Sequence, residues 1–165
     1  MEINKKTQKY VPEGYTILYV SLDNPYMTEA KNYARHYSLD STMLTGAVVV
    51  KENIIIGRGA NGSDYHSTHE CERVKQNIPS GERYDLCEGC SEKNHAEPSA
   101  IRNTEENGHL TEGADMYLWG HYYCCEWCWG AIIKAGIKQV YLMEGSEILF
   151  DKNHPDNIVG KQFSE

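Results

Sequence analysis

The spacing of apolar residues changes several times along the chain, and each change marks an expected element. The first regular stretch is 21–38, where apolar and aromatic side chains recur at helical spacing. Asp23 or Asn24 could cap this helix, and Pro25 would stand in its first turn. We therefore expect the first helix to begin at about residue 24.

Four stretches have the composition of strands. Residues 44–50 and 53–59 are rich in β-branched side chains and are separated by a short polar turn, which predicts a β-hairpin with both strands buried on two faces. Residues 114–120 and 137–143 are also predicted to be strands. The C-terminal residues after 146 are ambiguous and fit a short helix followed by a loop.

Helical spacing returns twice among these strands. Residues 95–106 form one expected helix, which ends near Gly108, and residues 125–136 form another, closed by Gly136. Strands that alternate with helices predict an α/β domain with helices on both faces of the sheet. The starts of these two helices should lie at one edge of that sheet.

The pattern is lost between residues 61 and 94, which are dense in Gly, Ser, Asn and charge. A structureless segment of that length is unusual inside a compact domain, so it is either disordered or ordered by something other than apolar packing. Its three Cys and two His suggest a metal ion.

Composition narrows the class of protein. The 165 residues and 40% hydrophobic content suit one domain spanning 1–165, with an insert at about 62–94. The chain has no apolar run long enough for a membrane span or a secretion signal, so we expect a soluble, cytoplasmic protein without a membrane partner. The net charge of −8 argues against a long nucleic acid as partner but allows a small nucleotide.

The cysteines carry the most specific signal. Cys125 and Cys128 are three apart at a predicted helix start, which places both sulfurs on one side of the first turn, and His95 at the other helix start could be a third ligand. Three protein ligands leave the fourth tetrahedral position of zinc for water, as in catalytic zinc sites. Glu97 cannot point the same way as His95, so it is free to lie beside that water.

This arrangement predicts a hydrolytic reaction. Zinc lowers the pKa of a bound water from about 15.7 to about 7. Glu97 could accept the proton and return it to a ring nitrogen and a departing amine, a form of general acid–base catalysis. The expected product is ammonia.

With these motifs the chain resembles the zinc-dependent cytidine and deoxycytidylate deaminases, whose signature is H-x-E followed by P-C-x-x-C. The resemblance covers roughly residues 20 to 145. It implies a three-layer α/β/α cytidine deaminase-like fold with a central mixed sheet of about five strands, and a homo-oligomer. It also implies that Asn61 contacts the substrate sugar and that the N–H of Ala96 faces the pyrimidine carbonyl. The chain departs from the signature at Cys124, where Pro is expected.

The long interval between Asn61 and His95 is similar to that of deoxycytidylate deaminases, in which a second zinc often orders this region. We therefore expect conversion of dCMP to dUMP and ammonia, with one catalytic and one structural zinc. The hypothetical structural site has four ligands, with His66 an equal alternative to His69: Cys71, Cys87, Cys90 and His69.

Other interpretations stay open from the sequence. The same residues could form a closed zinc site in a non-enzymatic interaction module, or serve a deaminase acting on tRNA or single-stranded nucleic acid. Asn61 could simply form a turn with Gly62. One aromatic residue near the second motif could stack on the base, and the basic residues nearest the motifs in sequence are candidates for a phosphate contact. The aromatic residues are Trp119, Tyr122, Tyr123 and Trp127, and the basic residues are Lys51, Arg58 and Lys93.

Overall fold

The computed structural model describes residues 10–40, 43–63, 68–78, 83–88, 91–159 and 161. Within them lies a five-stranded sheet of order β1-β5-β4-β2-β3. Strand β5 pairs in parallel with β1 and β4, whereas β2 is antiparallel to both β4 and β3. The strands are β1 (Ile17–Val20), β2 (Gly46–Lys51), β3 (Ile54–Ala60), β4 (Asp115–Trp119) and β5 (Gln139–Met143). The α-helices are α1 (Pro25–Tyr37), α3 (Glu72–Lys75), α4 (Ala96–Glu106), α5 (Glu126–Lys134) and α6 (Ser146–Leu149).

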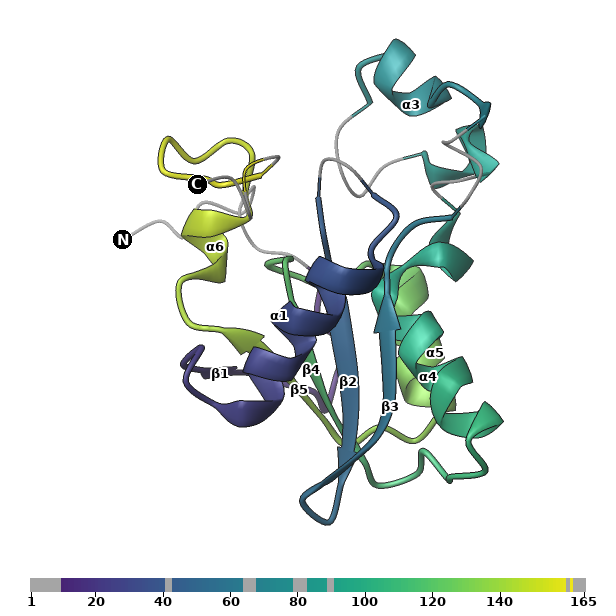
Figure 1. Ribbon diagram of the computed structural model, residues 1–165, viewed down its shortest axis with the longest axis vertical. Helices are drawn as coiled ribbons and strands as arrows, with labels where there is room; N and C mark the ends of the chain where they lie inside the picture. The colour runs from purple at the N-terminus through teal and green to yellow at the C-terminus, as the bar shows by residue number, and fades with distance from the viewer. Residues whose placement is uncertain are drawn as a thin grey trace.

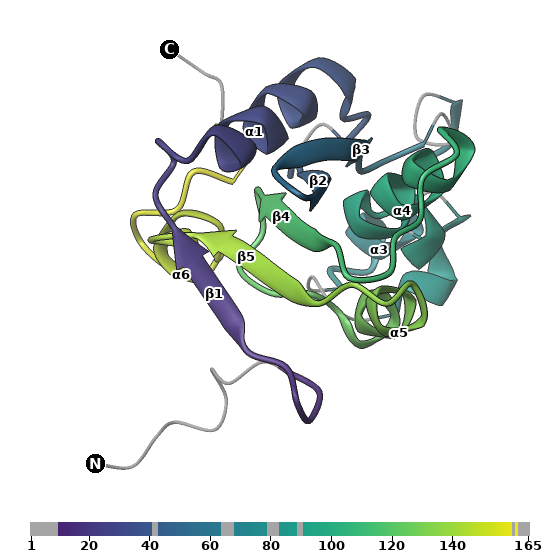
Figure 2. The ribbon, with the colours of Figure 1, turned by 90° about the horizontal axis from the view of Figure 1, so that it is seen from below.

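Helices cover both faces of this sheet (Figures 1 and 2). One buried cluster joins α1 to one face through residues such as Met27 and Val48. A second cluster joins α4 and α5 to the opposite face through residues such as Ala100, Ile132 and Val49. The three-layer architecture and the mixed five-stranded sheet expected from the sequence are therefore confirmed.

Local sequence explains how the first elements begin and turn. Asn24 caps α1, because its side chain accepts hydrogen bonds from the N–H groups of Tyr26 at 3.0 Å and Met27 at 3.2 Å. The hairpin between β2 and β3 turns at Glu52 and Asn53, one residue later than the sequence suggested, and both have positive φ angles of 52° and 63°. Two such residues match the turn geometry favoured in two-residue hairpins.

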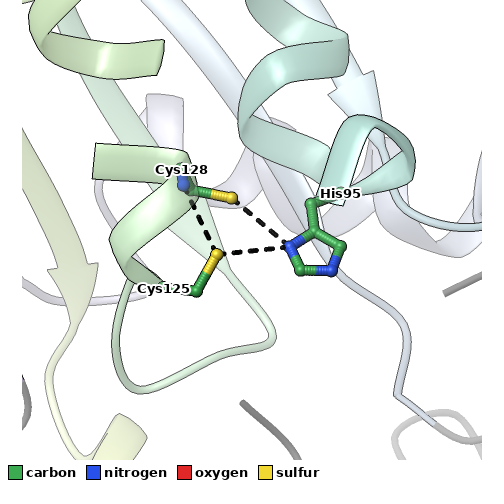
Figure 3. A group of neighbouring side chains, drawn as sticks. All are labelled: His95, Cys125 and Cys128. Atoms are coloured by element: carbon green, nitrogen blue, oxygen red, sulfur yellow. Dashed lines mark hydrogen bonds between the residues drawn. The ribbon is translucent and has the colours of Figure 1, made fainter. Parts of the chain in front are cut away.

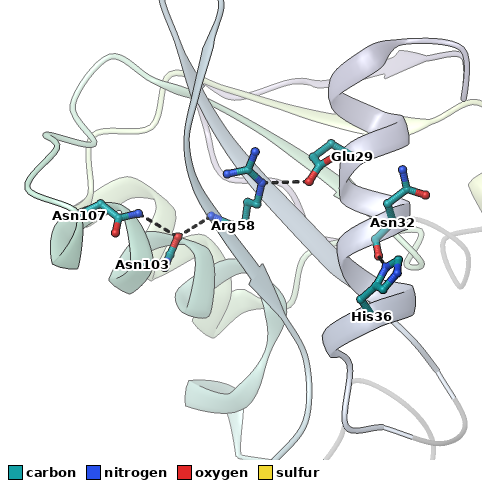
Figure 4. A network of polar contacts seen from close by, with 6 residues as sticks. All are labelled: Glu29, Asn32, His36, Arg58, Asn103 and Asn107. Atoms are coloured by element: carbon teal, nitrogen blue, oxygen red, sulfur yellow. Dashed lines mark hydrogen bonds and ion pairs between the residues drawn. The ribbon is translucent and has the colours of Figure 1, made fainter.

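Two sequence predictions about strands were incomplete. The four-residue β1 was missed, because it is short and lies at the sheet edge, pairing with β5 alone. The expectation that β3 is buried on both faces was wrong, because β3 is the other edge strand and Ile54 is 62% exposed. Arg58 lies midway along β3 and pairs with Glu29 of α1 at 3.0 Å, while its backbone N–H donates to Asn103 of α4 (Figure 4).

The close approach of α4 to β3 positions the site. A side chain at Gly59 would overlap the backbone of Ala100 and come within 2.6 Å of the Ala96 carbonyl oxygen. Glycine here lets the first turn of α4 lie directly on the strand. In the part of the chain that is described, no helix combines the length and apolar character needed to cross a bilayer.

Candidate metal centre and active site

Two helix starts supply the candidate ligands. His95 is the N-cap residue of α4, and Cys125 is the N-cap residue of α5. Cys128 lies in the first turn of α5, and its backbone N–H donates a 3.4 Å hydrogen bond to the Cys125 sulfur. Because first-turn N–H groups lack intrahelical partners, this end of a helix favours a thiolate. The predicted placement of both motifs at helix starts is confirmed.

The three side chains converge on one point (Figure 3). The Nδ1 atom of His95 lies 3.3 Å from the Cys128 sulfur and 3.7 Å from the Cys125 sulfur. In a tetrahedral zinc site, bond lengths of about 2.1 Å to nitrogen and 2.3 Å to sulfur separate these two atom types by about 3.6 Å. The observed distances therefore suit zinc, with Nδ1 as the ligand atom of the imidazole. Among the described residues, this is the one group of three or more His, Cys, Asp or Glu with such spacing.

The pKa values of the Cys125 and Cys128 thiols are shifted in opposite directions. A hydrogen bond from the Cys128 thiol is the main cause that lowers the pKa of Cys125 to about 5, with His95 adding to the effect. The same hydrogen bond, together with burial, raises the pKa of Cys128. Burial alone would lower the pKa of His95, but the hydrogen bond with Cys125 and the charge of Glu97 outweigh it and raise that pKa. Cys125 thus provides a ready thiolate for a cation.

Glu97 lies beside these ligands and is only 5% exposed. Burial, the largest cause, raises the pKa of its carboxyl group above the usual value, whereas the charge of His95 opposes this shift. A carboxyl group with a raised pKa is a stronger proton acceptor than an ordinary carboxylate, as a general base requires. Cys124 is also buried, in the core cluster that holds α4 and α5, and burial raises the pKa of its thiol well above normal, so it is a core residue rather than a nucleophile.

A cavity of about 840 Å³ opens onto this group. Its lining includes His95, Glu97 and Cys125, together with the Asn61 and Ala96 predicted to contact the substrate. Ala96 is the first residue of α4, where N–H groups have no partner within the helix. The structure therefore brings both residues to the same cavity as the ligands, which is compatible with the substrate contacts expected of them.

Asn61 also has a structural task. Its amide oxygen accepts hydrogen bonds from the backbone N–H of Thr45 at 2.9 Å and the hydroxyl of Ser38 at 2.5 Å. Its amide nitrogen donates to the Met43 carbonyl at 2.6 Å. An amide nitrogen carries two hydrogens, so one remains for a ligand. The turn interpretation of Asn61 thus underestimated the residue, which ties the segment before β2 to the end of β3.

Of the aromatic residues near the second motif, Tyr123 lines the cavity. Trp119 packs against Phe150 on the α1 side of the sheet, and Trp127 is 47% exposed on α5. His121, which precedes the tyrosine pair, also lines the cavity, and its Nδ1 accepts from the N–H groups of Tyr122 and Tyr123. Tyr123 is thus the one aromatic side chain of that group that lines the cavity.

The basic residues at the cavity were missed. None of Lys51, Arg58 and Lys93 lines it. Arg73 and Lys75 of the insert and Lys152 of the C-terminal segment line it instead, with Tyr84 of the insert. No local motif marks these residues, because folding alone brings 73–84 and 152 to the motif at 95–97. The density of charge in the insert was the only signal available.

The hypothetical structural zinc site stays a prediction. Cys90 and the alternative ligand His66 lie outside the described residues. The three described members fall in the insert: His69 and Cys71 precede α3, and Cys87 follows the short helical turn η1 (Tyr84–Leu86). A further 3-10 turn, η3 (Glu92–Asn94), leads into His95.

This fold and this ligand set define a class of zinc-binding deaminase domains. The family model described as the cytidine and deoxycytidylate deaminase zinc-binding region matches residues 20–144. The chain belongs to this family, as its motifs indicated.

Among individual proteins, the chain is similar to ComE operon protein 2 of Bacillus subtilis (strain 168), with 34% identity over 110 residues. The match covers 67% of this chain but spans only half the length of that relative. Among solved structures, it is similar to the dCMP deaminase of the cyanophage S-TIM5. The apo form shares 26% identity with a TM-score of 0.48, covering 73% of this chain and 82% of that one. The complex with dCMP and dUMP also shares 26% identity, with a TM-score of 0.49 and coverage of 72% and 79%.

Proposed function

We propose that this chain catalyses the hydrolytic deamination of a cytosine nucleotide, converting dCMP and water to dUMP and ammonia. One observation carries the proposal. The buried carboxyl group of Glu97 shares a cavity with His95 and Cys125, which converge with the buried Cys128 on one candidate zinc position. Family membership supports the same reaction class.

The residues divide the work between binding and proton transfer. His95, Cys125 and Cys128 would hold zinc, which supplies a Lewis acid and makes water a nucleophile near neutral pH. Glu97 accepts one proton of the attacking water and gives it to the ring nitrogen. It then transfers the second proton, from the new hydroxyl on the ring carbon, to the amino group, which leaves as ammonia while the carbonyl forms. The first-turn N–H of Ala96 holds the pyrimidine carbonyl, and the remaining amide hydrogen of Asn61 reaches the sugar.

The charge around the cavity favours a monophosphate. Arg73, Lys75 and Lys152 line the same cavity, although the whole chain carries a net charge of −8. Lys75 also pairs with Glu70 at 2.7 Å, whereas Lys152 has no ion pair within the described residues. We assign the 5′-phosphate contact to Lys152, with support from the guanidinium of Arg73.

The test is ammonia release from zinc-loaded protein and Glu97→Gln. Substrates are dCMP, CMP, deoxycytidine, cytidine, dCTP, guanine and a tRNA anticodon stem. Glu97→Gln should keep its zinc and lose at least about 100-fold in kcat, because the amide cannot shuttle a proton. The matched control is Glu126→Gln, which changes an exposed carboxylate in the first turn of α5 outside the cavity lining and should retain full activity.

The pattern of substrates separates the competing functions. Reaction with dCMP ahead of deoxycytidine supports the proposal. Reaction with the tRNA stem alone would assign a nucleic-acid deaminase. Absence of ammonia from every substrate, with zinc bound, would favour an interaction module and overturn the enzymatic assignment.

A further inference from the structure

The insert contacts a metal ligand directly. Tyr84, in the turn η1, packs edge-to-face on the imidazole of His95, with ring centroids 4.7 Å apart and an angle of 84° between the ring planes. Such aromatic pairs are stabilising beyond the area they bury, and their geometry is directional. The contact joins two segments that have no common helix or strand.

The contact matters for how the plane of the imidazole is fixed. A metal-binding His usually donates its second ring N–H to a carboxylate, a carbonyl or water, which sets the orientation of the ring. In His95, Nδ1 faces the two cysteine sulfurs, and within the described residues Nε2 has no hydrogen-bond partner. The Tyr84 ring therefore takes the place that a hydrogen-bonding partner usually holds.

Tyr84 is itself held from more than one side. The guanidinium of Arg73 lies over its ring, 4.3 Å from the centroid. On the cavity wall Tyr84 also forms a side-chain hydrogen bond with the buried Tyr123. A ring anchored by residues from α3 and from the segment after β4 is a firm surface against which His95 can be oriented.

We propose that Tyr84 is a positioning residue for the metal centre, which fixes the imidazole plane of His95 so that Nδ1 points at the position shared with Cys125 and Cys128. The insert thereby contributes to metal affinity as well as to the cavity wall. This inference rests on the metal-binding part of the proposed function but not on the identity of the substrate.

The test measures metal binding in the full chain. Zinc affinity is determined by competition with a chromophoric chelator, and the visible spectrum of the Co²⁺-substituted protein reports the ligand geometry. Tyr84→Leu should weaken zinc binding by about 10-fold or more, the effect typical of residues that orient a ligand, and should alter the Co²⁺ spectrum. Tyr84→Phe keeps the ring and should stay within about 3-fold of the parent protein with an unchanged spectrum.

Two further variants secure the test. Tyr84→Met also removes the ring but is flexible enough to fill the space, so it should repeat the loss seen with Leu even if the Leu variant folds poorly. Asp85→Asn is the matched control, because it changes the neighbouring exposed residue of the same turn. Among the described residues, the one ion pair of Asp85 is with Arg83 at 3.0 Å. It should bind zinc like the parent.

Parental affinity and spectrum in both the Leu and Met variants would overturn the inference, as would a loss in Tyr84→Phe equal to that in Leu. The outcomes are distinct from those of the proposed function. If no substrate releases ammonia while Tyr84→Leu weakens zinc, the positioning role stands and the catalytic assignment fails. If dCMP is deaminated while all Tyr84 variants bind zinc equally, the reverse holds.

Discussion

Asn61→Ala should destabilise the protein in the absence of any substrate. The amide of Asn61 holds three groups that precede β2: the Thr45 N–H, the Ser38 hydroxyl and the Met43 carbonyl. Alanine removes all three hydrogen bonds. The backbone bonds from Asn61 N–H to Thr45 and from Leu39 N–H to Asn61 can remain, since they do not involve the side chain.

The expected magnitude follows from what is left without a partner. Thr45 is 4% exposed and Met43 is 9% exposed, so water reaches their freed backbone groups poorly. A buried polar group left unsatisfied costs about 1–3 kcal/mol, and partial relaxation of the segment reduces the sum for two such groups. We expect Asn61→Ala to lower the free energy of unfolding by about 3 kcal/mol.

The assay is urea unfolding of the zinc-loaded protein at fixed zinc concentration. The midpoint should fall with little change in slope, which identifies a loss of stability rather than a change in compactness. Ser38→Ala is the matched control: it removes one of the three partners and should cost only about 1 kcal/mol. If Asn61→Ala keeps the free energy of unfolding within about 0.5 kcal/mol of the parent while KM for the nucleotide rises, the structural role is refuted and the residue serves the substrate alone.

Three other perturbations follow from the same structure. Lys152→Gln should raise KM for dCMP about 10-fold, which corresponds to the loss of one charge-assisted hydrogen bond, and should leave deoxycytidine turnover unchanged. The control Lys134→Gln changes an exposed residue of α5 and should affect neither substrate. Equal effects of Lys152→Gln on both substrates would exclude a phosphate contact. Gly59→Ala should destabilise the fold by about 2 kcal/mol or more and weaken zinc binding, because the added methyl group displaces α4. The control Gly130→Ala has open space around the added methyl group and should be neutral or stabilising in thermal unfolding. Zinc binding at pH 7 should release at least one proton, because Cys128 must lose its proton to bind the metal. Cys125 is already ionised, since the Cys128 hydrogen bond is the main cause that lowers its pKa to about 5. Calorimetry in buffers of different ionisation enthalpy measures the number of protons released, and a value of zero would contradict the assigned ligands.

The convergence of the three candidate metal ligands could be predicted because each depends on local sequence. A helix start is marked by its capping residue and by the periodicity that follows, and His95 and Cys125 are the capping residues themselves. Once both helices pack on the same face of the sheet, their N-termini meet. The same local reasoning found α1 and the hairpin, with its turn displaced by one residue.

The missed features depend on contacts between distant segments. Strand β1 is defined by its parallel pairing with β5, more than a hundred residues later, and nothing in four residues marks that pairing. The polarity of β3 follows from its place at the sheet edge, which allows Arg58 to meet Glu29 of α1. Tyr84 and Lys152 reach the cavity through an irregular insert and a C-terminal segment, where neither period nor motif specifies a position.

The acidic chain and the basic cavity residues are compatible for a physical reason. At physiological ionic strength, charges separated by more than about 8 Å are largely screened, so a ligand inside the cavity responds chiefly to nearby groups. A mononucleotide would meet Arg73 and Lys152 together with the zinc ligands, whereas a long nucleic acid would also lie across the acidic surface of a chain with net charge −8. We therefore expect the same composition that disfavours a polymer to accommodate a single phosphate, because the insert and the C-terminal segment contribute cations to the lining of the cavity.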